Sequence, residues 1–149
     1  MNKLRMYQTA PRLVTLGAIL ALFVSASTVR GAEPVCSQAT LSGTYVTSGA
    51  GTVPGGTTGT LAYVSVGKVT YDGRGGGVSS GTQSAGGTIS RSKRTATYTV
   101  NADCTGSKNF EGTTFDFVVT ADGREIFFIV TNAGVVLSGR AVRLDNSRN

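Results

Sequence analysis

Beyond residue 40, short runs of β-branched and aromatic residues alternate with polar residues, and Gly, Asn or Asp separate the runs. A period of two is typical of β-strands with one buried face, and this part of the chain sustains no helical period. The pattern predicts strands at residues 41–47, 59–71, 77–83, 88–100, 107–120, 125–132 and 135–144. Bulges in the longer runs would give seven or eight strands. The glycine-rich tract 49–59 is expected to be a loop.

One short motif, V-T-x-D-G-R, occurs at residues 69–74 and again at residues 119–124. Asp-Gly provides the positive φ angles of a tight hairpin turn. The repeat therefore predicts two equivalent hairpins, and the alternative is a paired Asp/Arg ligand site at one rim.

Alternation within the strands indicates which side is buried. Phe115, Phe117 and Val119 share a face, and Asp116 points away from it, either to solvent or into a lumen. The run 126–130 is apolar on both faces, which favours a closed barrel with something packed outside it, or a subunit interface. Without crossover helices, the expected fold is all-β, a single antiparallel β-barrel.

The N-terminal 27 residues read as a secretory signal peptide with a helical apolar core. Three basic residues precede an apolar run at 13–24, and small residues follow at 25–27. The run is about half of the roughly 20 residues that a membrane-spanning helix needs, although a retained anchor is the alternative. The expected organisation is a signal peptide at 1–27, a linker at 28–35, the barrel at 36–145 and a tail at 146–149. This predicts an exported protein, periplasmic or extracellular, with no stable membrane insertion after cleavage.

Charge does not indicate a nucleic-acid partner. Cleavage after residue 27 removes three basic and no acidic residues, which lowers the net charge from +6 to +3. The one basic cluster, Arg91, Lys93 and Arg94, has a single aromatic residue nearby, Tyr98. A mildly basic surface of this kind is typical of a soluble protein.

Cys36 and Cys104 are the two cysteines of the chain. In an exported protein they are expected to form one disulfide. The chain-entropy relation gives such a long loop roughly 4 kcal/mol of stabilisation. A reactive thiol or a metal pair is the alternative, but the sequence has neither a CxxC spacing nor a histidine to complete such a site.

The absence of histidine from the sequence limits the catalytic and metal-binding chemistry that the protein can perform. It excludes Ser-His-Asp and Cys-His catalysis and histidine-based metal sites, so no metal and no cofactor are expected. If the protein is an enzyme, the candidate groups are Glu111, Asp116 and Tyr98. Glu111 and Asp116 are five residues apart and face opposite sides of a regular strand, which argues against a glycosidase-type pair.

Two resemblances bear on the fold. Gly43-Thr44-Tyr45 on the first strand, with Arg140 or Arg143 on the last, looks like the lipocalin arrangement of G-x-W covered by a final-strand arginine, with Tyr in place of Trp. It implies barrel closure by Tyr45 and Arg140.

A wider likeness covers the segments C-S-Q-A-T-L-S-G-T-Y at 36–45, Y-D-G-R-G at 71–75, Y-T-V-N-A-D-C-T-G-S at 98–107, and the ending from 115–118 through 139–141. They resemble small exported bacterial proteins of unknown function, associated with allene-oxide-cyclase-like or dirigent-like barrels of the calycin group. That fold hosts both binders and cyclases, so the resemblance transfers no activity.

The expected role is therefore non-catalytic: binding of a small apolar ligand in the lumen, or a structural role in the envelope or outside the cell. The residues expected to line the core or cavity are Tyr63, Tyr71, Tyr98, Phe115 and Phe117. The alternative is a barrel cyclase or isomerase acting on a small apolar substrate. A third hypothesis is an assembly module that forms a homo-oligomer through the run 126–130.

Overall fold

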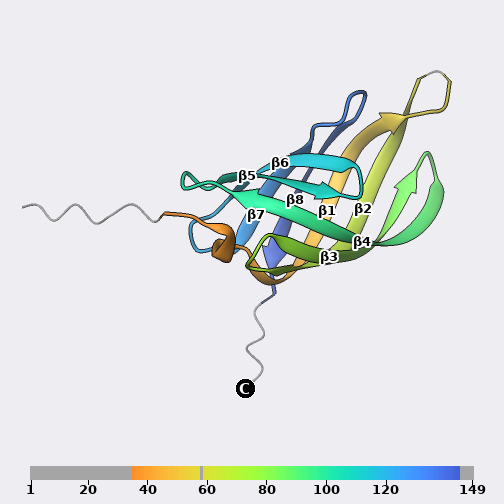
Figure 1. Ribbon diagram of the computed structural model, residues 1–149. Helices are drawn as coiled ribbons and strands as arrows, with labels where there is room; N and C mark the ends of the chain where they lie inside the picture. Colours follow the sequence, from red (N-terminus) through yellow and green to blue (C-terminus); the bar gives the residue numbers. More distant parts are fainter. Residues whose placement is uncertain (1–34, 58, 145–149) are drawn as a thin grey trace, which may run out of the picture. The chain divides into compact units, whose positions relative to one another are not determined.

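The computed structural model describes residues 35–57 and 59–144, so the predicted signal peptide and tail lie outside the described residues. These residues form a closed antiparallel barrel in which each strand pairs with the next and β8 pairs with β1 (Figure 1). The all-β barrel prediction is confirmed. After a short 3₁₀ helix, η1 (Gln38–Thr40), the strands are β1 (Ser42–Pro54), β2 (Thr60–Asp72), β3 (Gly76–Ala85), β4 (Thr88–Val100), β5 (Thr105–Phe110), β6 (Thr113–Val119), β7 (Glu125–Val130) and β8 (Val136–Arg143).

Residues 49–54 of the glycine-rich tract belong to β1, so the predicted loop over 49–59 is wrong for this part, and the loop is confined to the connection between Pro54 and Thr60. Gly49 pairs with Ser65 on β2 and with Gly139 on β8, inside the ladders of both neighbours. A Cβ on Gly51 would lie 1.9 Å from the Val136 carbonyl oxygen. Glycine here permits a close approach of two backbones, a tertiary reason that outweighs its low strand propensity.

The expected strand at 107–120 is instead two strands, β5 and β6. The break falls at Glu111 and Gly112, whose φ angles are 48° and 95°. Two successive residues with positive φ reverse the chain in a tight hairpin.

Both copies of the V-T-x-D-G-R motif form hairpin turns, as predicted, between β2 and β3 and between β6 and β7. In each turn the glycine has positive φ, 74° at Gly73 and 67° at Gly123. Asp72 Oδ1 accepts hydrogen bonds from the N–H groups of Arg74 and Gly76, and Asp122 Oδ1 accepts one from Arg124 N–H. The backbone bonds hold the pKa of Asp72 below the usual value. The pKa of Asp122 is lowered first by a hydrogen bond from the Thr120 hydroxyl at 2.6 Å and then by the Arg124 N–H. The two carboxylates therefore shape the turns.

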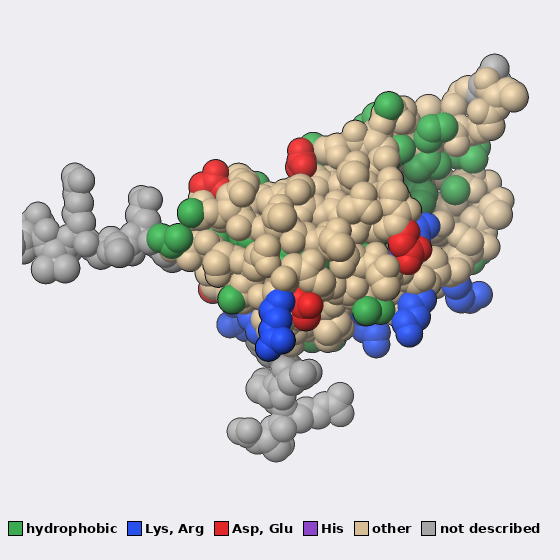
Figure 2. Space-filling model, viewed as in Figure 1, with side chains coloured by type: hydrophobic (Ala, Val, Ile, Leu, Met, Phe, Trp, Pro, Cys, Tyr) green, Lys and Arg blue, Asp and Glu red, His purple; other side chains and the backbone are tan. Residues whose placement is uncertain are grey.

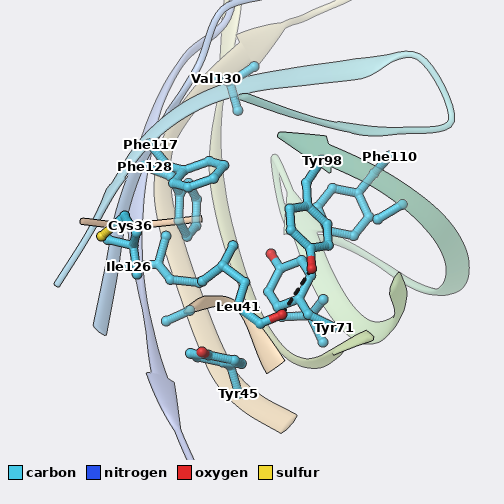
Figure 3. Close-up of a cluster of buried hydrophobic side chains, with 14 of the residues drawn as sticks. Cys36, Leu41, Tyr45, Tyr71, Tyr98, Phe110, Phe117, Ile126, Phe128 and Val130 are labelled. Carbon is cyan, nitrogen blue, oxygen red and sulfur yellow. Dashed lines mark hydrogen bonds between the residues drawn. The ribbon is translucent and has the colours of Figure 1, made fainter. Parts of the chain in front are cut away.

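The end of the barrel that carries these turns is filled with side chains, and we call it the closed end (Figure 3). Leu41, which follows η1, is fully buried there. Tyr98 donates its hydroxyl to the carbonyl oxygens of Leu41 (2.9 Å) and Gln38 (3.1 Å), and Tyr45 donates to the Gly123 carbonyl (2.6 Å). These bonds tie the segment before β1 and the β6–β7 turn to the barrel wall.

The predicted disulfide is present between Cys36 and Cys104, whose Cα atoms are 5.0 Å apart. Cys36 N–H also donates to the Ala102 carbonyl oxygen at 3.2 Å. The bridge therefore fastens the segment before η1 to the turn between β4 and β5 at the closed end.

Apolar side chains lie on the outer face of β7, and no described residue covers them. Ile126, Phe128 and Val130 point into the barrel, whereas Phe127 and Ile129 are 50% and 54% exposed. The closed barrel that this run favoured is present, whereas a cover over its outer face or a subunit interface stays a prediction. In residues 35–57 and 59–144, the structure contains no helix with the length and apolarity to cross a membrane.

Candidate functional site

A cavity of about 410 Å³ occupies the interior toward the opposite end, which we call the open end. The β1–β2, β3–β4, β5–β6 and β7–β8 turns surround this end. Hydrophobic side chains gather between the projecting β1–β2 and β3–β4 hairpins (Figure 2). A barrel of eight strands is just wide enough to be filled by its own side chains or to hold one small ligand. This barrel is filled at one end only.

Small side chains on one wall create the cavity. Over β1 to β3 the middle of this wall consists of Thr47, Ser65, Gly67, Ser79 and Gly81. Gly67 and Gly81 are cross-strand partners, and a Cβ on Gly67 would lie 2.6 Å from the Ser80 carbonyl oxygen. Larger residues at these interior positions would occupy the space, so the sequence of β1 to β3 keeps it open.

The opposite wall is aromatic. Phe115 packs edge to face against both Phe110 and Phe128, with ring centroids 5.6 Å apart in each pair. Phe128 is the cross-strand partner of Gly139, and a Cβ at Gly139 would lie 2.4 Å from Phe128 Cζ. The glycine thus leaves room for the ring to lie over the neighbouring strand. Val130 and Leu137 extend this apolar wall.

Lys108, on β5, reaches into this aromatic wall. It is 6% exposed and is the one charged side chain that is buried in the described part of the chain. Its Nζ lies 4.1 Å from the ring centroid of Phe128 and 5.0 Å from that of Phe115, with Phe110 and Phe117 within 6 Å. Burial lowers the pKa of Lys108 from its ordinary 10.5 to about 7. The rings offset part of the cost of burying the ammonium through cation–π attraction.

Within residues 35–57 and 59–144, no carboxylate or hydrogen-bond acceptor contacts Lys108 Nζ. The lowered pKa has burial as its cause, without a contribution from a neighbouring charge. Arg94 also lines the cavity and donates to Thr113 Oγ1 at 3.4 Å. The cavity lining contains no Asp or Glu. Lys68 is also a lining residue, but it is exposed at an outward position of β2. Two cationic side chains with inward register, Lys108 and Arg94, and no acidic one therefore face this space.

Two of the five aromatic residues proposed for the lumen line the cavity. They are Phe115 and Tyr63, whose hydroxyl donates to Gln83 Oε1 at 2.9 Å. Tyr71 and Tyr98 are buried in the closed end, where their rings meet edge to face with centroids 5.0 Å apart. Phe117 is buried but is not a lining residue, and its ring centroid lies 5.9 Å from Lys108 Nζ.

The structure does not bring the proposed catalytic groups together. Asp116 is exposed on the outer face of β6, and Tyr98 is buried in the closed end. Glu111 lies in the β5–β6 turn, where its Oε1 accepts hydrogen bonds from Thr95 N–H and Thr95 Oγ1. None of the three lines the cavity.

Tyr45 and Arg140 are also apart. Arg140 is exposed on the outer face, forms an ion pair with Glu125 and lies over the Phe127 ring at 5.8 Å. Tyr45 is fully buried and is the cross-strand partner of Arg143, the other arginine considered for this role. The alternation of side chains along β8 explains why the two residues do not meet, because Arg140 occupies an outward position of this strand.

Comparisons of the chain with protein-family models, curated proteins and solved structures find no match. The class of protein is defined by the fold and the cavity: it is a closed, up-and-down antiparallel barrel, filled at one end and hollow at the other. No group of three or more Cys, Asp, Glu or His residues in the described ranges is arranged to hold a metal ion.

Proposed function

We propose that the protein binds one small apolar molecule in the cavity at the open end and does not convert it chemically. The single observation that carries the proposal is an unfilled interior of about 410 Å³ with an aromatic wall, inside a barrel whose other end is tightly packed. Cavities of a few hundred Å³ with apolar walls and few polar groups are typical of small-molecule sites.

The relationship to calycin barrels is part of the same proposal. It is supported by the segments that resemble allene-oxide-cyclase-like and dirigent-like proteins, and by an up-and-down order of eight strands, which lipocalins also have. Export to the periplasm or beyond is proposed too, because an oxidised Cys36–Cys104 pair is compatible with an oxidising compartment.

A cyclase or isomerase is the second candidate, and one residue favours it. Tyr63 places a hydroxyl on the cavity wall and could orient or protonate a substrate. The carboxylates first considered for such chemistry lie elsewhere. Binding without turnover would separate the two candidates, because an enzyme of this kind would return an altered molecule from the cavity.

The test uses the purified, oxidised protein and a neutral apolar fluorophore, N-phenyl-1-naphthylamine. We expect saturable fluorescence enhancement with one site per chain. Ser65→Leu places a leucyl side chain into the cavity from β2 and should weaken binding about tenfold or more. Ser48→Leu makes the same change on an exposed position of β1 and should leave binding unchanged.

Two results would contradict cavity binding: no saturable enhancement with the unaltered protein, or equal losses with Ser65→Leu and Ser48→Leu. The first would favour a structural role. Native mass spectrometry of the protein from its own cells would then show a bare chain, instead of a co-purifying molecule whose mass identifies the ligand.

A further inference from the structure

We propose that the ligand is an amphipathic carboxylic acid, held with its carboxylate at Lys108 and its apolar tail along the aromatic wall toward the open end. This inference rests on the proposed binding function and names the chemical class of the ligand. It is carried by the geometry of the cavity and by the charges that face it.

The Lys108 amine has aromatic neighbours and no hydrogen-bond acceptor among the described residues. Lys108 Nζ lies among phenyl rings on the inner part of the aromatic wall, 4.1 Å from the Phe128 centroid. Aromatic rings attract an ammonium but accept no strong hydrogen bonds from its three N–H groups. A carboxylate would supply the acceptors and the opposite charge that the described residues do not provide. Charge-assisted hydrogen bonds of this kind are among the strongest in proteins.

The charge of the cavity lining is positive. Arg94 joins Lys108 on the wall, and the lining contains no acidic residue. A neutral apolar ligand would leave the buried Lys108 ammonium without a counter-charge, and a cationic ligand would be repelled by both cations. An anionic group on the ligand is therefore the complement that this cavity favours.

The spacing of the two cations favours a carboxylate over a phosphate. Tyr98 is the cross-strand partner of Lys108, and Arg94 precedes Tyr98 by four residues on β4. The Cα atoms of these two β4 positions are about 13 Å apart, and the Arg94 guanidinium donates to Thr113 Oγ1, so Arg94 is held by a hydroxyl of the open end, whereas Lys108 has no such partner among the described residues. Phosphate sites usually combine arginine forks or backbone N–H groups at a helix terminus. A single ammonium in an apolar setting suits a singly charged carboxylate.

Burial of Lys108 gives carboxylate binding a pH dependence. The titratable or charged groups with inward register on the strands of the barrel, besides Lys108, are Tyr98 and Arg94 on β4, Tyr63 and Tyr71 on β2, Tyr45 on β1 and Arg143 on β8. Tyrosines are neutral at neutral pH, and arginine keeps its charge. Between pH 6 and 9, titration of this interior is therefore dominated by the Lys108 amine, whose pKa is about 7.

The test measures displacement of N-phenyl-1-naphthylamine by decanoate and by 1-decanol, which share a chain length and differ in the acid. At pH 6.5 we expect decanoate to bind the unaltered protein about tenfold or more tightly than decanol. Above pH 7, decanoate affinity should fall by about tenfold per pH unit, because binding then requires proton uptake by Lys108, whereas decanol affinity should stay level.

Lys108→Met keeps the length and apolar character of the side chain and should remove both the preference for decanoate and its pH dependence, with decanol binding retained. Lys93→Met, at an exposed position of β4, is the matched control and should change neither. Retained decanol binding also shows that the Lys108→Met variant is folded.

The outcomes separate the two proposals. If the fluorophore binds but decanoate and decanol displace it equally, or if decanoate displaces it no better from the unaltered protein than from Lys108→Met, the carboxylate inference is overturned and cavity binding stands. The same holds if neither compound displaces a bound fluorophore. If the fluorophore itself does not bind, the proposed function fails first.

Discussion

At the residue scale, Lys108 gives the barrel an unusual dependence of stability on pH. Its pKa is about 7 in the folded protein and 10.5 is its ordinary value, taken here for the unfolded chain. Between these values the unfolded state binds more protons than the folded state, so the free energy of unfolding rises with pH. The cost of burying the ammonium is fully present below pH 7 and is relieved as pH rises from 7 toward 10.5.

The first prediction is that the unaltered protein gains about 2 to 3 kcal/mol over Lys108→Met between pH 6 and pH 9. Urea unfolding of both proteins at several pH values measures the difference in slope. The range stops at pH 9 because burial raises the pKa of Tyr45, Tyr71 and Tyr98, which adds a dependence of opposite sign at higher pH. Parallel profiles for the two proteins would show that the Lys108 amine stays charged in the fold.

The three buried tyrosines of the closed end allow a second, internally controlled prediction. Tyr45 and Tyr98 donate to backbone carbonyls, whereas the Tyr71 hydroxyl is buried without a hydrogen-bond partner in the described residues. Replacement by Phe should cost about 1 to 2 kcal/mol at Tyr45 and at Tyr98, and close to nothing at Tyr71, because only the first two lose a bond. Equal losses at all three positions, measured by urea unfolding, would contradict this.

At the scale of elements, the sequence predicted most strands and missed the residue that matters most for the candidate site. Treating 107–120 as one strand puts Lys108 on the face opposite to Phe115 and Phe117, toward solvent. The turn at Glu111 and Gly112 resets the alternation, so that Lys108 and Phe110 face inward from β5 while Phe115 and Phe117 face inward from β6. A shift of one residue exchanges the two faces of a strand, so the single-strand prediction placed Lys108 on the outer face.

The signal for this break was the Glu-Gly pair at 111–112, which is weaker than the Asp-Gly pairs of the repeated motif. The repeated motif predicted its hairpins because the turn is local, formed by an Asp side chain and a Gly backbone within a few residues. The cavity was not predictable in the same way. It depends on which interior positions of different strands meet at one level, and that is fixed by the register around the whole barrel.

The third prediction concerns the β6–β7 turn. A Cβ on Gly123 would lie 2.3 Å from the Thr40 carbonyl oxygen, and the Gly123 carbonyl accepts the Tyr45 hydroxyl. Gly123→Ala should therefore cost about 3 kcal/mol, from left-handed strain together with a disturbed buried hydrogen bond. Gly87→Ala is the control, since Gly87 also has positive φ, 86°, but has open space around it, and about 1 kcal/mol is expected there. Similar costs in urea unfolding would show that the turn does not dock tightly on the segment before β1.

At the scale of the whole barrel, stability and the proposed binding belong to opposite ends. The closed end holds the disulfide, the tyrosine hydrogen bonds and the fully buried Leu41. The open end contains the cavity, and the small residues of its wall make fewer packing contacts than larger side chains would, which leaves space for a ligand. A site built this way can keep an unfilled interior because the other end holds the strands in register.

The last prediction tests this division through the bridge. A variant with Cys36→Ser and Cys104→Ser should lose roughly 4 kcal/mol, because the bridge restricts a long segment of the unfolded chain, between cysteines 68 residues apart. Under conditions in which this variant remains folded, its affinity for N-phenyl-1-naphthylamine should stay within about twofold of the unaltered protein, since the bridge lies at the end away from the cavity. Urea unfolding and probe titration measure the two quantities on the same samples. A large loss of affinity in the folded variant would mean that the closed end controls the shape of the cavity, and the two ends would then have to be treated as one coupled unit.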